Sequence, residues 1–168
     1  MAQTMTSSRF GEISYTEEDV IFFPRGIPAF EHNRSWVLAG DDTNAVKWLQ
    51  NIEDGDLALP VTSPDAIMPD YNAKIPEDEL DIIGSRNPAD LALLIVVSIP
   101  ESAPWNMTAN LRAPILVNLK NRKAVQVIVL NEDFPIRHVV FPENVREAMK
   151  LQALTEQAEQ EHAREGAV

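Results

Sequence analysis

The chain has 168 residues, of which 45% are apolar and 24% charged, and this composition is typical of one globular domain and not of a disordered chain. The absence of cysteine excludes disulfides, thiolate nucleophiles and cysteine-ligated zinc. The formal net charge of −12 at pH 7 argues against direct binding to DNA or RNA, whose phosphates it would repel, and fits either a basic protein partner or simple solubility.

The N-terminal residues 1–8 have neither the basic segment nor the apolar segment of a secretory signal. The longest apolar run, residues 91–99, is too short to cross a bilayer as a helix, which needs roughly 20 residues. We therefore expect a cytoplasmic protein with no membrane partner, and we expect residues 1–7 to be a flexible terminus.

Short apolar or alternating runs, separated by turn residues, follow from residue 9 onward. Twelve prolines punctuate the chain, and this spacing is typical of many short strands joined by turns. The segment Pro24-Arg25-Gly26-Ile27-Pro28 predicts a tight turn, because glycine tolerates positive φ and proline fixes φ. The strands predicted in this part of the chain are residues 9–15, 20–23, 35–39, 46–52 and 57–62.

A short helix is predicted over residues 76–84. Proline suits the first turn, the acidic residues 77–79 suit the positive end of the helix dipole, and Gly84 is placed to end the helix. The almost wholly apolar residues 91–99 predict a strand buried on both faces, at the centre of a sheet or barrel. The remaining predicted strands are the hairpin 115–119 and 124–130, and residues 136–141.

From residue 143 the chain contains no glycine or proline until Gly166, and its residues are good helix formers. Apolar residues gather in the first half of this segment, whereas the second half has almost no apolar stripe. We predict a helix that is docked at its start and solvated or frayed at its end. No repeat or linker divides the chain, so the elements predict one mainly β domain followed by a helix.

Few residues offer chemistry. His138 follows Arg137 in a predicted strand and is either a base or a hydrogen-bonded structural histidine. No histidine pair has metal-ligand spacing, and no glycine-rich phosphate loop or serine nucleophile motif is present. We therefore expect no enzyme activity, no metal and no cofactor.

One loop, residues 66–72, places Met68, Pro69 and Tyr71 between polar turns. Apolar and aromatic loop residues are either folded back onto the core or presented to a partner, and the sequence leaves both alternatives open. Trp105, in a later loop, is similarly either a cap over the end of a barrel or an interface residue.

Several segments along the chain read together as the signatures of one family. They are Phe22-Phe23-Pro24-Arg25-Gly26-Ile27-Pro28-Ala29-Phe30, Trp48-Leu49-Gln50, Pro69-Asp70-Tyr71 with Leu80-Asp81-Ile82-Ile83-Gly84 after it, Met107-Thr108-Ala109-Asn110-Leu111-Arg112-Ala113-Pro114-Ile115, and Phe134-Pro135-Ile136-Arg137-His138. In this order they resemble signatures of the bacterial flagellar assembly factor family FliW. Ala29 stands where the family usually has glycine, Phe134 where it has tyrosine, and the pair Ile67-Met68 where it often has aromatic residues. The helix from residue 143 extends beyond the compact family members.

The resemblance implies a small, partly open antiparallel β-barrel with one short internal helix and a C-terminal helical extension. We assign residues 8–141 to the barrel domain and residues 142–168 to the helical tail. It also implies two competing protein partners: flagellin, held before export, and CsrA, a small basic dimeric regulator that binds mRNA and represses flagellin translation. Once flagellin is exported, the freed factor would antagonise CsrA, and the acidic charge of this chain suits a basic partner.

For the contact with CsrA we expect an apolar and aromatic loop beside acidic residues. The expected contact residues are Met68, Pro69, Asp70, Tyr71 and Asn72. Two alternatives stay open at this stage. One is a small-molecule-binding barrel with Arg137 and His138 at its mouth, and the other is a flagellin chaperone without a regulatory role.

Overall fold

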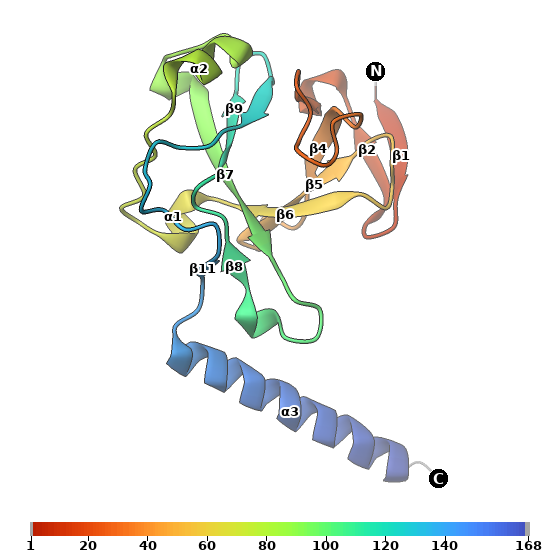
Figure 1. The fold of residues 1–168 in the computed structure, drawn as a ribbon. Helices are drawn as coiled ribbons and strands as arrows, with labels where there is room; N and C mark the ends of the chain where they lie inside the picture. Colours follow the sequence, from red (N-terminus) through yellow and green to blue (C-terminus); the bar gives the residue numbers. More distant parts are fainter. Residues whose placement is uncertain (1, 167–168) are drawn as a thin grey trace.

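A computed structural model describes residues 2–166 of the chain (Figure 1). Its helices are α1 (Pro64–Ile67), α2 (Glu77–Ile83) and α3 (Glu143–Gly166), and its 3-10 turns are η1 (Glu17–Asp19), η2 (Pro88–Asp90) and η3 (Pro104–Asn106). Its strands are β1 (Gln3–Ser7), β2 (Gly11–Tyr15), β3 (Ile21–Phe22), β4 (Ser35–Ala39), β5 (Val46–Asn51), β6 (Ala58–Thr62), β7 (Leu91–Ser98), β8 (Thr108–Ala109), β9 (Ile115–Asn118), β10 (Ala124–Gln126) and β11 (His138–Val139).

Nine strands form one curled sheet whose order is β10-β9-β7-β6-β5-β4-β3, with β8 paired to β7 and β11 paired to β8. All pairs of named strands in this sheet are antiparallel. The two edges of the sheet approach each other where β3 meets the turn before β10: the N–H of Phe22 donates to the carbonyl of Arg122 at 2.9 Å, and Phe22 forms an isolated bridge with Lys123. The sheet is therefore curled but not closed, and the predicted partly open antiparallel barrel is confirmed.

The interior of the curled sheet is filled by side chains. Trp36, Phe23 and Leu49 are fully buried there, and the rings of Phe23 and Trp36 meet edge to face at 6.4 Å. The indole N–H of Trp36 donates to the carbonyl of Asn33 at 2.8 Å, so its one polar group is satisfied. Two further clusters lie under α2 and under the loop that follows α1.

The central strand β7 is less buried than the sequence predicts. Ile95 and Val97 are buried, but Leu91 to Leu94 and Val96 are only half-buried. Leu91 and Leu93 pack against one buried cluster, and Leu94 and Val96 pack against another, so both faces of β7 are covered as predicted, although most of its side chains stay partly exposed.

The N-terminal segment differs from the flexible terminus that we expected for residues 1–7. Residues 3–7 form β1, which pairs with β2 in a separate two-stranded sheet. Met5 is buried against Tyr15 and Val37, so alternate side chains of the hairpin cover the outside of the large sheet. This burial supplies the free energy that holds the segment in place.

The short internal helix is confirmed as α2, which ends at Gly84 with a left-handed φ of 78°. A second short helix, α1, was not predicted. The N–H of Met68, the residue after α1, donates to the carbonyl of Pro64 at 2.8 Å and closes the helix. The predicted strand over residues 136–141 is reduced to β11. The backbone on either side of it still bonds to the 107–111 segment, since the carbonyl of Pro135 accepts from the N–H of Leu111 at 3.1 Å and the N–H of Val140 donates to the carbonyl of Met107 at 3.1 Å.

The helix α3 extends away from the sheet and touches the domain at η3 (Figure 1). Trp105 of η3 is half-buried and, with Arg146 and Lys150, lines a hollow of about 230 Å³ beside the helix. Leu151 and Leu154 are 66% and 54% exposed, which agrees with a helix that is docked only at its start. Among the described residues, no helix combines the length and the apolar character that a membrane span requires.

Candidate functional site

The loop of residues 68–72 is held by short local bonds directly after α1. The N–H of Tyr71 donates to the carbonyl of Met68 at 3.0 Å, which closes a tight turn around Pro69 and Asp70. Met68 and Tyr71 pack against a buried cluster that contains Ile95. Two of the five predicted contact residues are therefore folded back onto the core.

Tyr71 is the anchor of this loop. Its hydroxyl donates to the backbone carbonyl of Leu111 at 2.7 Å, and its ring stacks on Phe134 at 5.0 Å with an angle of 21° between the rings. Burial raises the pKa of the Tyr71 phenol to about 12, so the group stays neutral at physiological pH and keeps donating this hydrogen bond.

The remaining three predicted residues, Pro69, Asp70 and Asn72, are exposed. The far end of the loop is fixed by Asn131, whose amide nitrogen donates to the carbonyl of Asn72 at 3.0 Å. The same side chain accepts from the N–H of Lys74 at 2.7 Å. The outward side chains thus stand on a loop that is tied at both ends, which lowers the entropy that a partner must remove on binding.

This anchoring brings together segments that are far apart in the sequence. Tyr71 belongs to Pro69-Asp70-Tyr71, Leu111 to the 107–115 segment and Phe134 to the 134–138 segment. Three of the segments that carry the family resemblance therefore meet in one place. The contact of Tyr71 with Leu111 spans 40 positions, and the sequence carries no signal for it.

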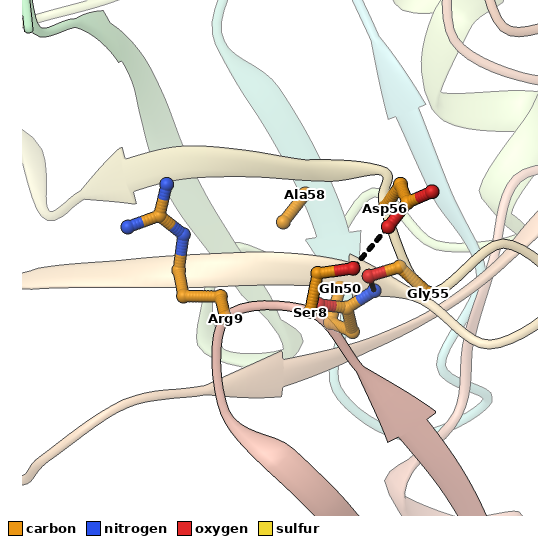
Figure 2. A pocket seen from close by; sticks show the side chains of 6 residues that line it. All are labelled: Ser8, Arg9, Gln50, Gly55, Asp56 and Ala58. Atoms are coloured by element: carbon orange, nitrogen blue, oxygen red, sulfur yellow. Dashed lines mark hydrogen bonds between the residues drawn. The ribbon is translucent and has the colours of Figure 1, made fainter.

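A second polar site lies where the β1–β2 hairpin meets the large sheet (Figure 2). Gln50 is fully buried, and its amide nitrogen lies within hydrogen-bond distance of the carbonyls of Asn51 at 3.1 Å, Asp54 at 3.2 Å, Gly55 at 3.3 Å and Leu57 at 3.1 Å. Its amide oxygen accepts from the Ser7 hydroxyl at 2.7 Å.

The hollow next to Gln50 has a volume of about 350 Å³, and Ser8 donates to Asp56 at its rim. Figure 2 shows the Arg9 guanidinium directed away from that pair, and Arg9 lies over the ring of Trp48 at 3.6 Å. A Cβ on Gly55 would lie 2.2 Å from the carbonyl oxygen of Thr6, so only glycine fits there. The polar groups bond one another, and this arrangement joins the hairpin to the sheet.

Arg137 directly precedes β11 and His138 lies within it, on the branch of the sheet that runs from β7 through β8 to β11. His138 is half-buried in β11 opposite Ala109, and Arg137 is exposed beside a surface hollow of about 490 Å³. The interior of the barrel, in contrast, is occupied by the side chains of Trp36, Phe23 and Leu49. Within residues 2–166, no group of three or more histidine and acidic side chains is positioned to hold a metal ion.

Sequence reasoning missed two of the residues that shape these sites. Asn131 follows a strand-like segment and reads as an ordinary turn residue, yet it fixes the 68–72 loop. Gln50 was included only as part of the Trp48-Leu49-Gln50 segment. Local sequence gave no clear signal for its burial, because the same strand also contains Lys47 and Asn51.

Comparisons with known proteins agree on one family. The family model described as FliW protein matches residues 4–140. A flagellar assembly factor FliW from Thermotoga maritima is 37% identical over 137 residues, which cover 81% of this chain and 92% of the relative. One from Caldanaerobacter subterraneus subsp. tengcongensis is 38% identical over 141 residues, or 83% and 93% of the two chains.

The fold agrees with the sequence comparison. A crystal structure of the flagellar assembly factor FliW superimposes with a TM-score of 0.77 at 28% identity, and the match covers 84% of this chain and 99% of the other. The helix α3 lies beyond the residues that the family model matches. Residues 4–140 carry both the family sequence and the family fold, and the chain belongs to the FliW family of flagellar assembly factors.

Proposed function

We propose that this protein is a non-enzymatic regulator in the cytoplasm that binds flagellin and, when flagellin is exported, binds and antagonises CsrA. Membership of a family of flagellar assembly factors supports a role with flagellar proteins. Partner switching of this kind needs only two competing affinities, and none of its steps requires a catalytic group.

The observation that carries the CsrA part of the proposal is the 68–72 loop. Pro69, Asp70 and Asn72 are exposed on a loop that Tyr71 and Asn131 hold in place. A preformed surface with an acidic group suits a basic partner, and the net charge of −12 would steer that partner toward the protein. Met68 and Tyr71 contribute by supporting the loop from below.

Calorimetric titration of the purified chain with CsrA, and separately with flagellin from the same organism, tests the switch. We expect binding of CsrA at about micromolar dissociation constant or tighter, reversed by added flagellin. Binding of flagellin alone would reduce the function to that of a chaperone. Binding of neither protein would contradict the proposal and would direct attention to the hollow beside Arg137.

The site is tested by charge reversal at matched positions. Asp70→Lys and Glu12→Lys make the same change in net charge, and both side chains are exposed. We expect Asp70→Lys to weaken CsrA binding about tenfold or more, and Glu12→Lys to change only the salt-dependent association rate. Equal effects of the two variants would assign the binding to overall charge and remove the loop from the interface.

A further inference from the structure

The segment of residues 124–130 offers one side of its backbone to solvent. The N–H groups of Val127 and Val129 donate to the carbonyls of Pro114 at 3.0 Å and Arg112 at 2.9 Å, so the backbone groups of these alternate residues face the neighbouring chain. Because neighbouring residues of an extended chain point their backbone groups in opposite directions, those of Gln126 and Ile128 face outward.

Both ends of this outer edge are paired. Near its start, the carbonyl of Arg122 accepts from Phe22 at 2.9 Å, and Phe22 forms a parallel bridge with Lys123. At its end, the N–H of Leu130 donates to the carbonyl of Lys74 at 2.8 Å. Between these points the N–H and C=O of Ile128 make no hydrogen bond with any residue from 2 to 166. The outer edge of this segment therefore has a gap, a stretch of about two residues whose backbone groups have no strand partner.

The gap exists because the turn after β3 carries the chain away. Gly26 has a φ of 69° and Ala29 a φ of 77°, and the N–H of Phe30 donates to the carbonyl of Ile27 at 2.7 Å, which makes residues 24–30 a compact turn. The space left has a volume of about 370 Å³. It is lined by Arg25, Gly26, Pro28, Glu31, Glu79 and Ile128, among others.

Within the segment itself, the residues lack the features that normally protect a strand edge. Residues 124–130 contain no proline and no charged residue, and Ile128 and Leu130 are 69% and 61% exposed. Natural proteins usually place charges, prolines or covering loops at such edges, because an unprotected edge pairs with other chains. An open, aliphatic and uncharged edge is what a strand from a partner would require.

We infer that this gap takes an extended segment of another protein, which adds as a strand beside Gln126 and Ile128. The segment would pair with the free N–H and C=O of Ile128 and place an aliphatic side chain against Ile128. Glu31 and Glu79 at the rim outnumber Arg25, which itself pairs with Glu79. The occupant should therefore carry basic residues between its aliphatic ones. The inference concerns a different contact from that of the 68–72 loop and does not depend on the identity of the partners proposed above.

A labelled nonapeptide of alternating valine and lysine is the probe, and fluorescence anisotropy and amide exchange are the readouts. We expect saturable binding below about 1 mM and about tenfold slower exchange of the Ile128 amide in the complex. The Val127 amide, which is already bonded, serves as the internal control. The same peptide N-methylated along one edge should bind about tenfold more weakly, because it cannot donate to the strand.

Substitutions in the chain separate backbone pairing from side-chain contact. Ile128→Pro removes the N–H, whereas Ile128→Ala keeps it and shortens the side chain, so we expect the first variant to lose more binding. If Ile128→Pro does not fold, comparison of the N-methylated peptide with the unmethylated one still tests whether binding depends on backbone pairing. The inference is overturned by an absence of saturable binding, by equal binding of the N-methylated peptide, or by unchanged exchange at Ile128. Dimerisation of the chain that Ile128→Pro abolishes would assign the edge to a second copy instead.

Discussion

The hydroxyl of Tyr71 donates to the backbone carbonyl of Leu111 across 2.7 Å, and this bond joins the loop after α1 to the segment before β9. A buried carbonyl without a hydrogen-bond donor costs free energy. The bond therefore stabilises the loop and also supplies a donor to the carbonyl of Leu111. The ring of Tyr71 adds a stacked contact with Phe134.

Replacement of Tyr71 by phenylalanine should lower the free energy of unfolding by about 1 kcal/mol, because it keeps the stacked ring and removes the hydrogen bond. Urea denaturation measures the change. Tyr15→Phe is the matched control: the Tyr15 hydroxyl makes a longer bond of 3.3 Å to the side chain of Gln3 near the terminus. A loss for Tyr71→Phe no larger than for Tyr15→Phe would contradict the anchoring role.

Stability should also depend on this phenol at alkaline pH. Burial raises the pKa of Tyr71 from 10.0 to about 12, so the folded state holds the proton more tightly than the unfolded state. The resulting stabilisation is complete below the unfolded pKa of 10.0 and is lost as the pH rises through about 12. Tyrosinate absorbance of Tyr15→Phe, in which Tyr71 is the only tyrosine left, reports the titration directly. A midpoint near 10 in the folded variant would refute the prediction.

The turn at residues 24–30 contains a strained alanine. Ala29 has a φ of 77°, a left-handed conformation that costs a residue with a Cβ roughly 1–2 kcal/mol and costs glycine almost nothing. After the larger unfolded-state entropy of glycine is subtracted, Ala29→Gly should stabilise the protein by about 0.5–1 kcal/mol. Ala103→Gly is the control, since Ala103 has an extended φ of −148° and its replacement should destabilise slightly. Thermal unfolding of both variants checks the difference in sign.

Gln50 should be among the most sensitive polar positions of the domain. Gln50→Leu leaves the Ser7 hydroxyl and several buried carbonyls without their partner, which should cost about 3 kcal/mol. Gln126→Leu is the control, because the half-buried Gln126 donates one bond, to the carbonyl of Ala113 at 3.0 Å. Denaturant unfolding in which both variants lose the same stability would show that the Gln50 network contributes little.

Removal of residues 143–168 should leave the domain folded. The main contact of helix α3 with the rest of the protein is with η3, and its contacts with the strands of the large sheet are weaker. Val140 and Phe141 pack against a core cluster, so the truncated chain must keep them. We expect a change below about 1 kcal/mol in the free energy of unfolding, together with a loss of helical circular dichroism. A peptide of residues 143–166 should be largely unfolded in water, since isolated helices of this kind are marginal. Unfolding of the truncated chain would show that α3 is part of the core.

Local patterns were sufficient to predict most elements of the sheet. Residues 35–39 were predicted as a strand and form β4 with those bounds, because a short apolar run next to turn residues is a signal contained within one segment. The helix α2 was predicted from its acidic first turn and from Gly84, which are also local signals. β1 was missed because its burial comes from Tyr15 and Val37, which the hairpin brings against it only after the sheet has formed.

The candidate site shows the same limit. The sequence singled out residues 68–72 but left open whether the side chains face the core or a partner. The structure divides them, since Met68 and Tyr71 pack inward and Pro69, Asp70 and Asn72 face outward. That division is set by Leu111, Phe134 and Asn131, which lie 40 or more residues away, and no pattern within the loop carries this information.

Asn131 belongs to two surfaces at once. It fixes the carbonyl of Asn72 and the N–H of Lys74, and the carbonyl of Lys74 in turn receives the N–H of Leu130 at the end of the open strand edge. A ligand that shifts the edge and a partner that holds the loop would therefore act on the same few bonds. By thermodynamic reciprocity, the factor by which either one changes the affinity of the other must be identical in both directions.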